Sequence, residues 1–395
     1  MLVSYPVRGR TTLIRKVIMY ISTYEELSAF CDRASGYPAV AIDTEFLREK
    51  TFHPRLCLVQ AATPDESVAI DPLAIDDLSP LADFMENEQV VKVFHACSQD
   101  MEVLYNTLGA LPAPIFDTQV AAAFLGERLQ ISYHNLVQSF CNVSLPKTES
   151  LTDWSRRPLT PKQIEYAIDD VRYLITCYKV MTDRLEEEGR LSWVLDETRP
   201  LAALSHYKTD RRQAYKRVKR ISSCTRKQLA VARELAAWRE DRAERHNIPR
   251  KWVMSDDVLL ALVKRAPRDV TGFRGIRGTE QLSERDVDGA LVAIANGVRC
   301  PAENYPAAFH VRKGASAELE SVTDLMYALI RLVSERSGVA TAMIASRDDL
   351  VGYVECPEKS PLRDGWRFEL VGTLLDDLLA GNMGLTVKDK KVEVL

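Results

Sequence analysis

Several common functional signatures are missing from this chain of 395 residues. Its eight cysteines form no Cys-x-x-Cys pair and its six histidines no His-Glu-x-x-His motif, which argues against a zinc site. The wide cysteine spacing is typical of reduced thiols in the cytosol, so we expect a cytoplasmic location. No apolar run approaches the ~20 residues that a membrane-spanning helix requires. We therefore expect no membrane partner.

We also expect no secretory signal. Residues 1–18, MLVSYPVRGRTTLIRKVI, are basic and contain neither a long apolar segment nor a small-residue cleavage site. We expect this stretch to be disordered or to be an extension ahead of a working start at Met19.

The charges are unevenly distributed around a formal net charge of −4. Residues 206–278 contain 20 Lys or Arg against 8 Asp or Glu, a balance of +12, which leaves −16 for the rest of the chain. A basic segment on an acidic body often contacts phosphate groups. Within it, the stretch YKRVKR at 215–220 fits either a phosphate-binding stripe or a solvated linker.

Strands and helices alternate in the first half of the chain. Short apolar runs separated by turn residues predict strands at 39–46, 55–63, 67–73 and 90–97. Capped amphipathic segments predict helices at 22–36, 98–109, 117–127, 132–143 and 160–189. The first three strands form a meander and the fourth returns in parallel. This order indicates an α/β layered domain over residues 19–200.

The second half of the chain is almost entirely helical. A long helix, a short Asp-capped helix and a closing helix occur twice, at 225–246, 255–267 and 283–297, and again at 321–338, 346–355 and 365–382. We therefore expect a linker at 201–217, a helical module at 218–298 and a more divergent one at 315–390.

Two carboxylates occur close together in the strand sequence AIDTEF. Asp43 and Glu45 are two residues apart and therefore share one face of the strand. Like charges near a core repel one another and are costly to bury. A divalent cation would compensate them, because hard cations prefer several carboxylate oxygens.

Further groups are available to complete such a site. Asp100 lies in the first turn of the helix after the fourth strand, and Tyr166 and Asp170 share a helix face because they are four residues apart. Four carboxylates can hold two Mg²⁺ or Mn²⁺ ions ~3.5–4 Å apart, which suits phosphoryl displacement by water. Tyrosine is a weak base with a free pKa of ~10, so Tyr166 better suits orienting the water.

Each of these residues also has a plainer interpretation. Asp43 and Glu45 fit a solvated strand end, Asp100 a helix-start acid favoured by the helix dipole, and Tyr166 and Asp170 the edge of the core. Other residues fit structural roles: a helix cap for Asp117, a turn for Asp71, a loop anchor for Trp154 and a packed strand end for His95. Asp169 lies three residues from Tyr166 and is a rival to Asp170.

The motifs together resemble a known family. The stretches DTEF and HACSQD and the pair Tyr166-x-x-x-Asp170 are similar to the tyrosine subclass of the DEDD exonuclease superfamily. The stretches IDTEFLREKTFHPRLCLVQ, FDTQVAAAFLG, LTDWSRRPLT and YAIDDVRYL more closely resemble the ribonuclease D family. The helical modules resemble the HRDC domains that follow the nuclease domain in that family and also occur in RecQ helicases.

The resemblance implies an RNase H-like 3′–5′ exonuclease domain, a mixed sheet flanked by helices, followed by two HRDC-type modules. By the family's pattern Asp43 would bridge two divalent ions, Glu45 and Asp170 would bind the ion on the nucleophile side, and Asp100 would help to hold the second. The Tyr-x-x-x-Asp spacing selects Asp170 over Asp169.

Contacts to the substrate are less specifically indicated. The family's pattern places Thr44 and Phe46 near the ribose and base of the terminal nucleotide. His95 lies five residues before Asp100 in the sequence and is therefore expected near the site. Lys147 and Arg157, in the loop before the Tyr166 helix, fit phosphate contacts or pairing with local acids.

We expect the protein to hydrolyse the terminal phosphodiester of RNA and so release nucleoside 5′-monophosphates from the 3′ end. The expected substrates are tRNA precursors, and we expect no obligate protein partner. Two other functions also fit: a 3′–5′ exonuclease that acts on DNA in repair, since fold does not decide the substrate, and a non-catalytic RNA-binding protein. A non-catalytic protein of this kind would be expected to have lost a metal-binding residue, whereas all four acids and Tyr166 are present in this chain.

Overall fold

The computed structural model describes residues 3–5, 12–14, 17–145, 153–208, 210–309 and 316–395. The chain forms two compact units. One contains residues 1–45, 56–203 and 314–395, and the other contains residues 46–55 and 204–313. No helix among the described residues is long and apolar enough to cross a membrane.

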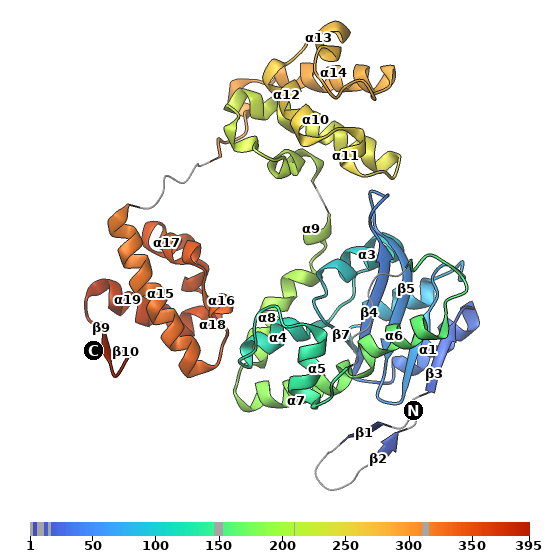
Figure 1. Ribbon diagram of the computed structural model, residues 1–395, viewed down its shortest axis with the longest axis vertical. Helices are drawn as coiled ribbons and strands as arrows, with labels where there is room; N and C mark the ends of the chain where they lie inside the picture. The colour runs from blue at the N-terminus through green and yellow to red at the C-terminus, as the bar shows by residue number, and fades with distance from the viewer. Residues whose placement is uncertain (1–2, 6–11, 15–16, 146–152, 209, 310–315) are drawn as a thin grey trace. The chain divides into compact units, whose positions relative to one another are not determined.

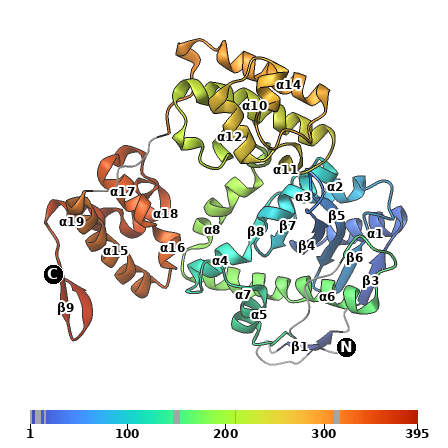
Figure 2. The same ribbon diagram turned by 45° about the horizontal axis from the view of Figure 1, so that its top comes forward.

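A six-stranded mixed sheet forms the centre of the first unit, in the order β3-β6-β5-β4-β7-β8 (Figure 2). The strands are β3 (Val17–Ile21), β4 (Ala39–Leu47), β5 (Arg55–Ala62), β6 (Glu66–Ile70), β7 (Val91–Phe94) and β8 (Ile115–Asp117). β5 pairs antiparallel with β6, while β3 with β6, β4 with β7, and β7 with β8 pair in parallel. The expected mixed sheet flanked by helices is confirmed.

Two strands of the central sheet were not expected from the sequence. β3 begins two residues before Met19 and pairs with β6 from Val17↔Glu66 to Ile21↔Ile70. β8 is only three residues long and leads straight into a helix capped by Asp117. A separate hairpin, β1 (Val3–Tyr5) with β2 (Thr12–Ile14), lies in the stretch that we expected to be disordered or an extension.

Helices cover the sheet (Figure 1). They are α1 (Tyr24–Ala34), α2 (Ser79–Glu86), α3 (Ser98–Leu108), α4 (Thr118–Phe124), α5 (Tyr133–Cys141), α6 (Pro161–Arg172), α7 (Leu174–Glu187) and α8 (Leu191–Thr198). Side-chain caps start several of them as expected, and Gly109, with φ +73°, ends α3.

The prediction of a single helix at 160–189 is wrong, because the helix breaks at Tyr173 into α6 and α7. The two halves have different packing partners: α6 packs on β6, whereas α7 packs on α4 and α5. Tyr173 is buried at the junction. Hydrophobic periodicity alone could not reveal this change of partner.

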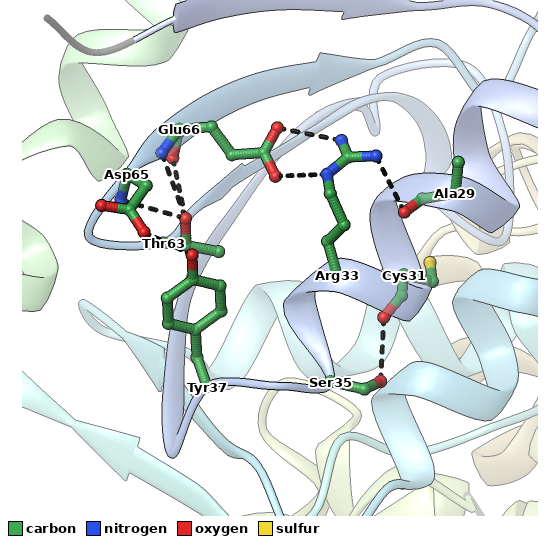
Figure 3. Close-up of polar contacts among 8 residues, drawn as sticks. All are labelled: Ala29, Cys31, Arg33, Ser35, Tyr37, Thr63, Asp65 and Glu66. Carbon is green, nitrogen blue, oxygen red and sulfur yellow. Dashed lines mark hydrogen bonds and ion pairs between the residues drawn. The ribbon is translucent and has the colours of Figure 1, made fainter.

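Polar contacts connect α1 and the segment after it to the turn between β5 and β6 (Figure 3). The Arg33 guanidinium of α1 donates to both carboxylate oxygens of Glu66 in β6, at 2.9 and 3.0 Å. The Thr63 hydroxyl accepts from the backbone N–H groups of Asp65 and Glu66, which closes the turn before β6. Tyr37 donates its hydroxyl proton to Asp65 at 2.5 Å. These bonds fix α1 and the β5–β6 turn at the edge of the sheet.

The first helical module belongs to the second unit. After α9 (Leu204–Tyr207) it comprises α10 (Arg226–Arg245), α11 (Arg250–Val253), α12 (Asp256–Arg265), α13 (Val270–Arg274) and α14 (Glu284–Val298). α10 is the central helix and packs on both α12 and α14. Gly297 of α14 allows close approach, because an added Cβ would lie 2.4 Å from Cα of Val231.

The second helical module packs into the first unit. It comprises α15 (Ala317–Ser337), α16 (Thr341–Ile344), α17 (Arg347–Glu355), α18 (Gly365–Arg367) and α19 (Thr373–Ala380), followed by the hairpin β9 (Leu385–Lys388) and β10 (Lys391–Val394). Trp366 stacks on Trp193 of α8 at 5.5 Å and meets Phe124 of α4 edge-on at 4.9 Å. Its indole N–H donates to Glu197 at 3.0 Å. The module therefore shares a core with the α/β domain.

Candidate active site

β4 positions two of the four predicted carboxylates. Asp43 and Glu45 lie near its carboxyl end and share one face, since strand side chains alternate. Both are partly exposed, whereas Thr44 between them is buried. Burial, and then repulsion from Asp43, Asp170 and Asp100, raises the pKa of Glu45 to about 9. The charges of all four acids therefore act on one another.

A tight turn between β7 and α3 presents Asp100. Ala96 in this turn has φ +62°, a left-handed conformation that is costly for a residue other than glycine. The Asp117 carboxylate accepts from the N–H groups of Ala96 at 3.1 Å and Cys97 at 2.8 Å, which stabilises the turn. The Thr44 hydroxyl donates to Asp100, which is 7% exposed. Asp100 is thus attached directly to the strand that bears Asp43 and Glu45.

α6 supplies the remaining two groups. A capping box of Thr160 and Gln163, with Pro161 in the first turn, starts the helix. Tyr166 and Asp170 follow on one helix face, both partly exposed. The ring of Tyr166 lies 6.0 Å from that of Trp154, which is buried and thus anchors the preceding loop.

The carboxyl pKa values show that these groups converge. Burial, followed by the charge of Asp170, raises the pKa of Asp43 to about 8. Burial, followed by the charge of Asp43, raises the pKa of Asp100 well above its usual range. For Asp170, burial and then Asp169 raise the pKa to about 7. β4, the start of α3 and one face of α6 therefore meet at a single cluster of acids.

Tyr166 belongs to the same electrostatic cluster. Burial, and then the charges of Asp170, Glu45 and Asp43, raise its pKa to about 12. The phenol consequently keeps its proton at physiological pH. In this form it can donate a hydrogen bond.

The donor set suits divalent cations. None of the four carboxylates forms an ion pair with a basic side chain among the described residues, so their repulsion is uncompensated. Hard divalent cations prefer such oxygen ligands. In the described part of the chain, however, no three His, Cys, Asp or Glu side chains are gathered closely enough to hold an ion as they stand. An ion would therefore bind only after these carboxylates moved closer together.

His95 has a structural role in this site. Its Nε2 lies 3.0 Å from the carbonyl oxygen of Ile131 and its Nδ1 lies 2.9 Å from the Thr118 hydroxyl. Burial lowers the pKa of the imidazole, which favours the neutral ring. Because Nε2 must donate to the carbonyl, Nδ1 carries no proton in that form; it lies against the Thr118 hydroxyl, which itself donates to the carbonyl oxygen of Phe94 at 3.0 Å. With both nitrogens engaged, the proposed substrate contact of His95 has no support here.

Arg157 is likewise fully engaged within the protein. Its five N–H donors meet both oxygens of Asp71, at 2.5 and 2.6 Å, and the carbonyl oxygens of Cys57, Trp154 and Arg156. No donor remains for an RNA phosphate in this conformation, so we no longer propose Arg157 as a substrate contact. The alternative of pairing with an acid describes it better. Lys147 lies outside the described residues.

The two remaining substrate residues keep their status as predictions. The Thr44 hydroxyl donates to Asp100. Phe46 is partly exposed, and the guanidinium of Arg48 lies 6.0 Å from its ring centroid.

Two positioning residues were missed in the sequence. Asp117 was expected only as a helix cap, but its carboxylate also stabilises the turn before Asp100. Tyr133 of α5 is partly buried and donates its hydroxyl proton to the backbone oxygen of Asp169 in α6, 3.0 Å away. No short sequence motif indicates either hydrogen bond, because the two partners are more than 15 residues apart in the sequence.

The arrangement agrees with known protein families. Residues 18–186 match the family model described as 3′-5′ exonuclease, and residues 228–285 match the HRDC domain. The fold, the acid cluster and these matches define a 3′–5′ exonuclease with a helical HRDC region. A protein named ribonuclease D from Sphingobium indicum is 38% identical over 95% of this chain and 97% of its own length. One from Nitrobacter hamburgensis is 39% identical over 94% and 98%.

A solved structure supports the same assignment. The crystal structure of Escherichia coli RNase D, described as an exoribonuclease involved in structured RNA processing, superimposes with a TM-score of 0.80. It is 29% identical, and the match covers 93% of this chain and 99% of that one. The chain belongs to the ribonuclease D family and is a hydrolase of the 3′–5′ exoribonuclease class.

Proposed function

We propose that this exoribonuclease matures tRNA 3′ ends by hydrolysis at the cluster of Asp43, Glu45, Asp100, Asp170 and Tyr166. The observation that carries the proposal is the convergence of four uncompensated carboxylates, each with a raised pKa, beside a phenol that keeps its proton. Phosphodiester hydrolysis needs charge stabilisation at the attacking and leaving oxygens, which such a ligand set can provide when it is loaded with cations.

The residues have distinct roles in this proposal. Asp43 would bridge two divalent cations, Glu45 and Asp170 would bind the one on the nucleophile side, and Asp100 would help to hold the other. When bound, two Mg²⁺ or Mn²⁺ ions would activate the attacking water and stabilise the leaving 3′ oxygen. Tyr166 would orient that water by hydrogen bonding. The bond between phosphorus and the 3′ oxygen breaks, which releases a nucleoside 5′-monophosphate and leaves a new 3′ hydroxyl on the RNA.

Substitution of a single acid tests the cluster. Asp43→Ala should lower hydrolysis by about 10³-fold or more, while RNA binding persists. Asp183→Asn is the control, because this exposed acid of α7 pairs with Lys179 at 3.5 Å and is assigned no catalytic role. Full activity of Asp43→Ala, or equal losses in both variants, would refute the assignment. Calorimetric titration with Mn²⁺ should show binding that Asp43→Ala abolishes.

The substrate requires a separate experiment. Matched RNA and DNA oligonucleotides, incubated with Mg²⁺ or Mn²⁺, should show preferential release of ribonucleotides. A pool of tRNA precursors mixed with other RNAs, sequenced after digestion, should show 3′ trimming concentrated on the tRNA precursors. Equal degradation of DNA would indicate a repair exonuclease instead.

A further inference from the structure

Two thiols of the first unit are in direct contact. Cys141 is the last residue of α5 and Cys177 lies in the first turn of α7, two helices that lie side by side (Figure 1). Their Sγ atoms are 3.3 Å apart, so one thiol donates a hydrogen bond to the other. A disulfide requires ~2.05 Å, which an approach of roughly 1.2 Å would achieve. The fold therefore brings these two sulfurs close to bonding distance.

The two thiols differ in exposure and in acidity. Cys141 is partly exposed, whereas Cys177 is completely buried. The hydrogen bond between them lowers the pKa of Cys141 and raises the pKa of Cys177, because Cys177 keeps its proton and donates it. The thiolate is the reactive form of cysteine. Cys141 is therefore the sulfur that a small oxidant in solution meets first, and Cys177 lies in contact with it as the second thiol.

This pair adjoins the junction between α6 and α7. The backbone N–H of Cys177 donates to the carbonyl oxygen of Tyr173, where α6 ends and α7 begins, at 2.9 Å. The other helix of the pair, α5, also holds α6, because its Tyr133 hydroxyl donates to the backbone oxygen of Asp169. Asp170 of the acid cluster follows directly. A covalent bond between the two sulfurs would therefore act on the helix that carries Asp170.

We propose that Cys141 and Cys177 form a redox site, at which hydrogen peroxide converts the two thiols into a disulfide and thereby slows the nuclease. The bond draws the start of α7 towards the end of α5 and displaces the adjoining end of α6 from its catalytic position. A misplacement of about 1 Å can cost about 10²-fold in rate. The inference goes beyond the proposed function, because it does not depend on which RNA is the substrate.

The reaction consumes one peroxide and no other reagent. The Cys141 thiolate attacks one peroxide oxygen, the O–O bond breaks, and the departing hydroxide takes up the proton that Cys141 released. The Cys177 sulfur then attacks the resulting sulfenic acid. The S–S bond forms, the S–O bond breaks, and the second hydroxide leaves as water with the proton of Cys177. Two thiols are oxidised to a disulfide while one peroxide is reduced to two waters.

Mass spectrometry of the full chain tests whether the bond forms. The protein is treated with hydrogen peroxide in EDTA, which prevents metal-catalysed oxidation, and the remaining thiols are blocked with N-ethylmaleimide. Trypsin separates the two cysteines into the peptides 129–147 and 173–179. These peptides should appear as a linked pair that dithiothreitol separates. Thiols that are only packed as small apolar side chains would give an unlinked Cys141 peptide, and that result would overturn the proposal.

Activity measurements test the consequence of the bond. After removal of peroxide, the oxidised wild type should hydrolyse RNA about 10²-fold more slowly than the reduced protein, and dithiothreitol should restore the rate. Cys177→Ala should keep the reduced rate after peroxide treatment, because it cannot form the bond. Cys141→Ala should behave in the same way and, at a partly exposed position, guards against a folding defect of the buried substitution. Cys356→Ala removes an exposed cysteine of the second helical module and, as the matched control, should be inactivated like the wild type.

The outcomes separate this site from other effects of peroxide. Equal inactivation of Cys141→Ala, Cys177→Ala and the wild type would show that peroxide acts elsewhere and would overturn the proposal. A disulfide that leaves the rate unchanged would also overturn it, because the bond would not control the nuclease. Absence of RNA hydrolysis in the reduced wild type would refute the proposed function, while the linked peptides would still decide whether the bond forms.

Discussion

Arg157 holds both carboxylate oxygens of Asp71, with Nε 2.5 Å from Oδ2 and Nη2 2.6 Å from Oδ1. The two residues are 86 positions apart, and Asp71 is almost completely buried. The Tyr20 hydroxyl donates to the same carboxylate. The pair thus joins the loop before α6 to the end of β6, and so helps to fix the helix that bears Tyr166 and Asp170.

Asp71→Asn should therefore reduce the free energy of unfolding at neutral pH by about 3 kcal/mol, because it leaves a largely buried guanidinium without its counter-charge. Chemical denaturation measures this loss. Asp153→Asn is the control, because its ion pair with Arg156 is exposed and should contribute less than about 1 kcal/mol. Similar values for the two variants would contradict the structural role.

The same pair predicts a dependence on pH. Burial raises the pKa of Asp71, but hydrogen bonds from Arg157, Tyr20 and the Leu73 backbone outweigh it, so the net pKa is lowered. A lowered pKa in the folded state contributes stability that is present above the unfolded value of ~3.9 and is lost as pH falls through the folded pKa. On acidification below pH ~4 the wild type should lose more stability than Asp71→Asn. Parallel stability curves for the two proteins would contradict this.

Asp117→Asn should weaken catalysis indirectly. The carboxylate accepts backbone N–H groups from Ala96 and Cys97 through different oxygens, and the amide can replace only one of them. We expect about 1–2 kcal/mol lower stability and a drop in kcat with little change in KM. Thr23→Ala, which removes the cap of α1, should cost similar stability without the catalytic loss. Equal activity losses in the two variants would indicate a general effect.

Tyr166→Phe should lower kcat by about 10²-fold and leave Mn²⁺ affinity unchanged, because only the orienting hydroxyl is lost. Since the pKa of Tyr166 is raised to about 12, the phenol should not produce a limb in the rate profile below pH ~10. A limb in that range that disappears in Tyr166→Phe would show that the tyrosine acts as a base.

Trp366→Ala should destabilise the first unit by about 3–5 kcal/mol, as truncation of a buried aromatic residue does. Hydrogen exchange should increase in α4, α8 and the second helical module. The first helical module should keep its protection, because it forms a separate compact unit. Leu379→Ala, at an exposed position of α19, should have little effect. Loss of protection in both units would show that they unfold together.

Much of the acid cluster could be predicted from sequence because each part has a local signal. The spacing of Asp43 and Glu45 on a strand, and of Tyr166 and Asp170 on a helix, follows from the repeat of each element. Their convergence was inferred from the need to compensate charge and from the resemblance to a family. The structure places them within electrostatic reach of one another, although Asp170 is more than 120 residues from Asp43.

The features that escaped prediction depend on distant partners. β3 begins in the last two residues of a basic stretch that looks like an extension, and its pairing with β6 makes it a strand. The break at Tyr173 depends on which helices α6 and α7 meet. Arg157 looked like a phosphate ligand because its acid partner, Asp71, is remote in sequence. In each case the local sequence is compatible with two structures, and contacts with residues distant in the sequence determine which one forms.

The shared core of the α/β domain and the second helical module makes residues 204–313 an insertion, since the chain leaves one compact unit and returns to it. Folding must therefore close a long loop before Trp366 can reach Trp193 and Phe124. The entropy of closure grows only with the logarithm of loop length, so a tenfold shorter linker would ease it by about 2 kcal/mol. A chain whose first module is exchanged for a short linker should thus assemble this core faster.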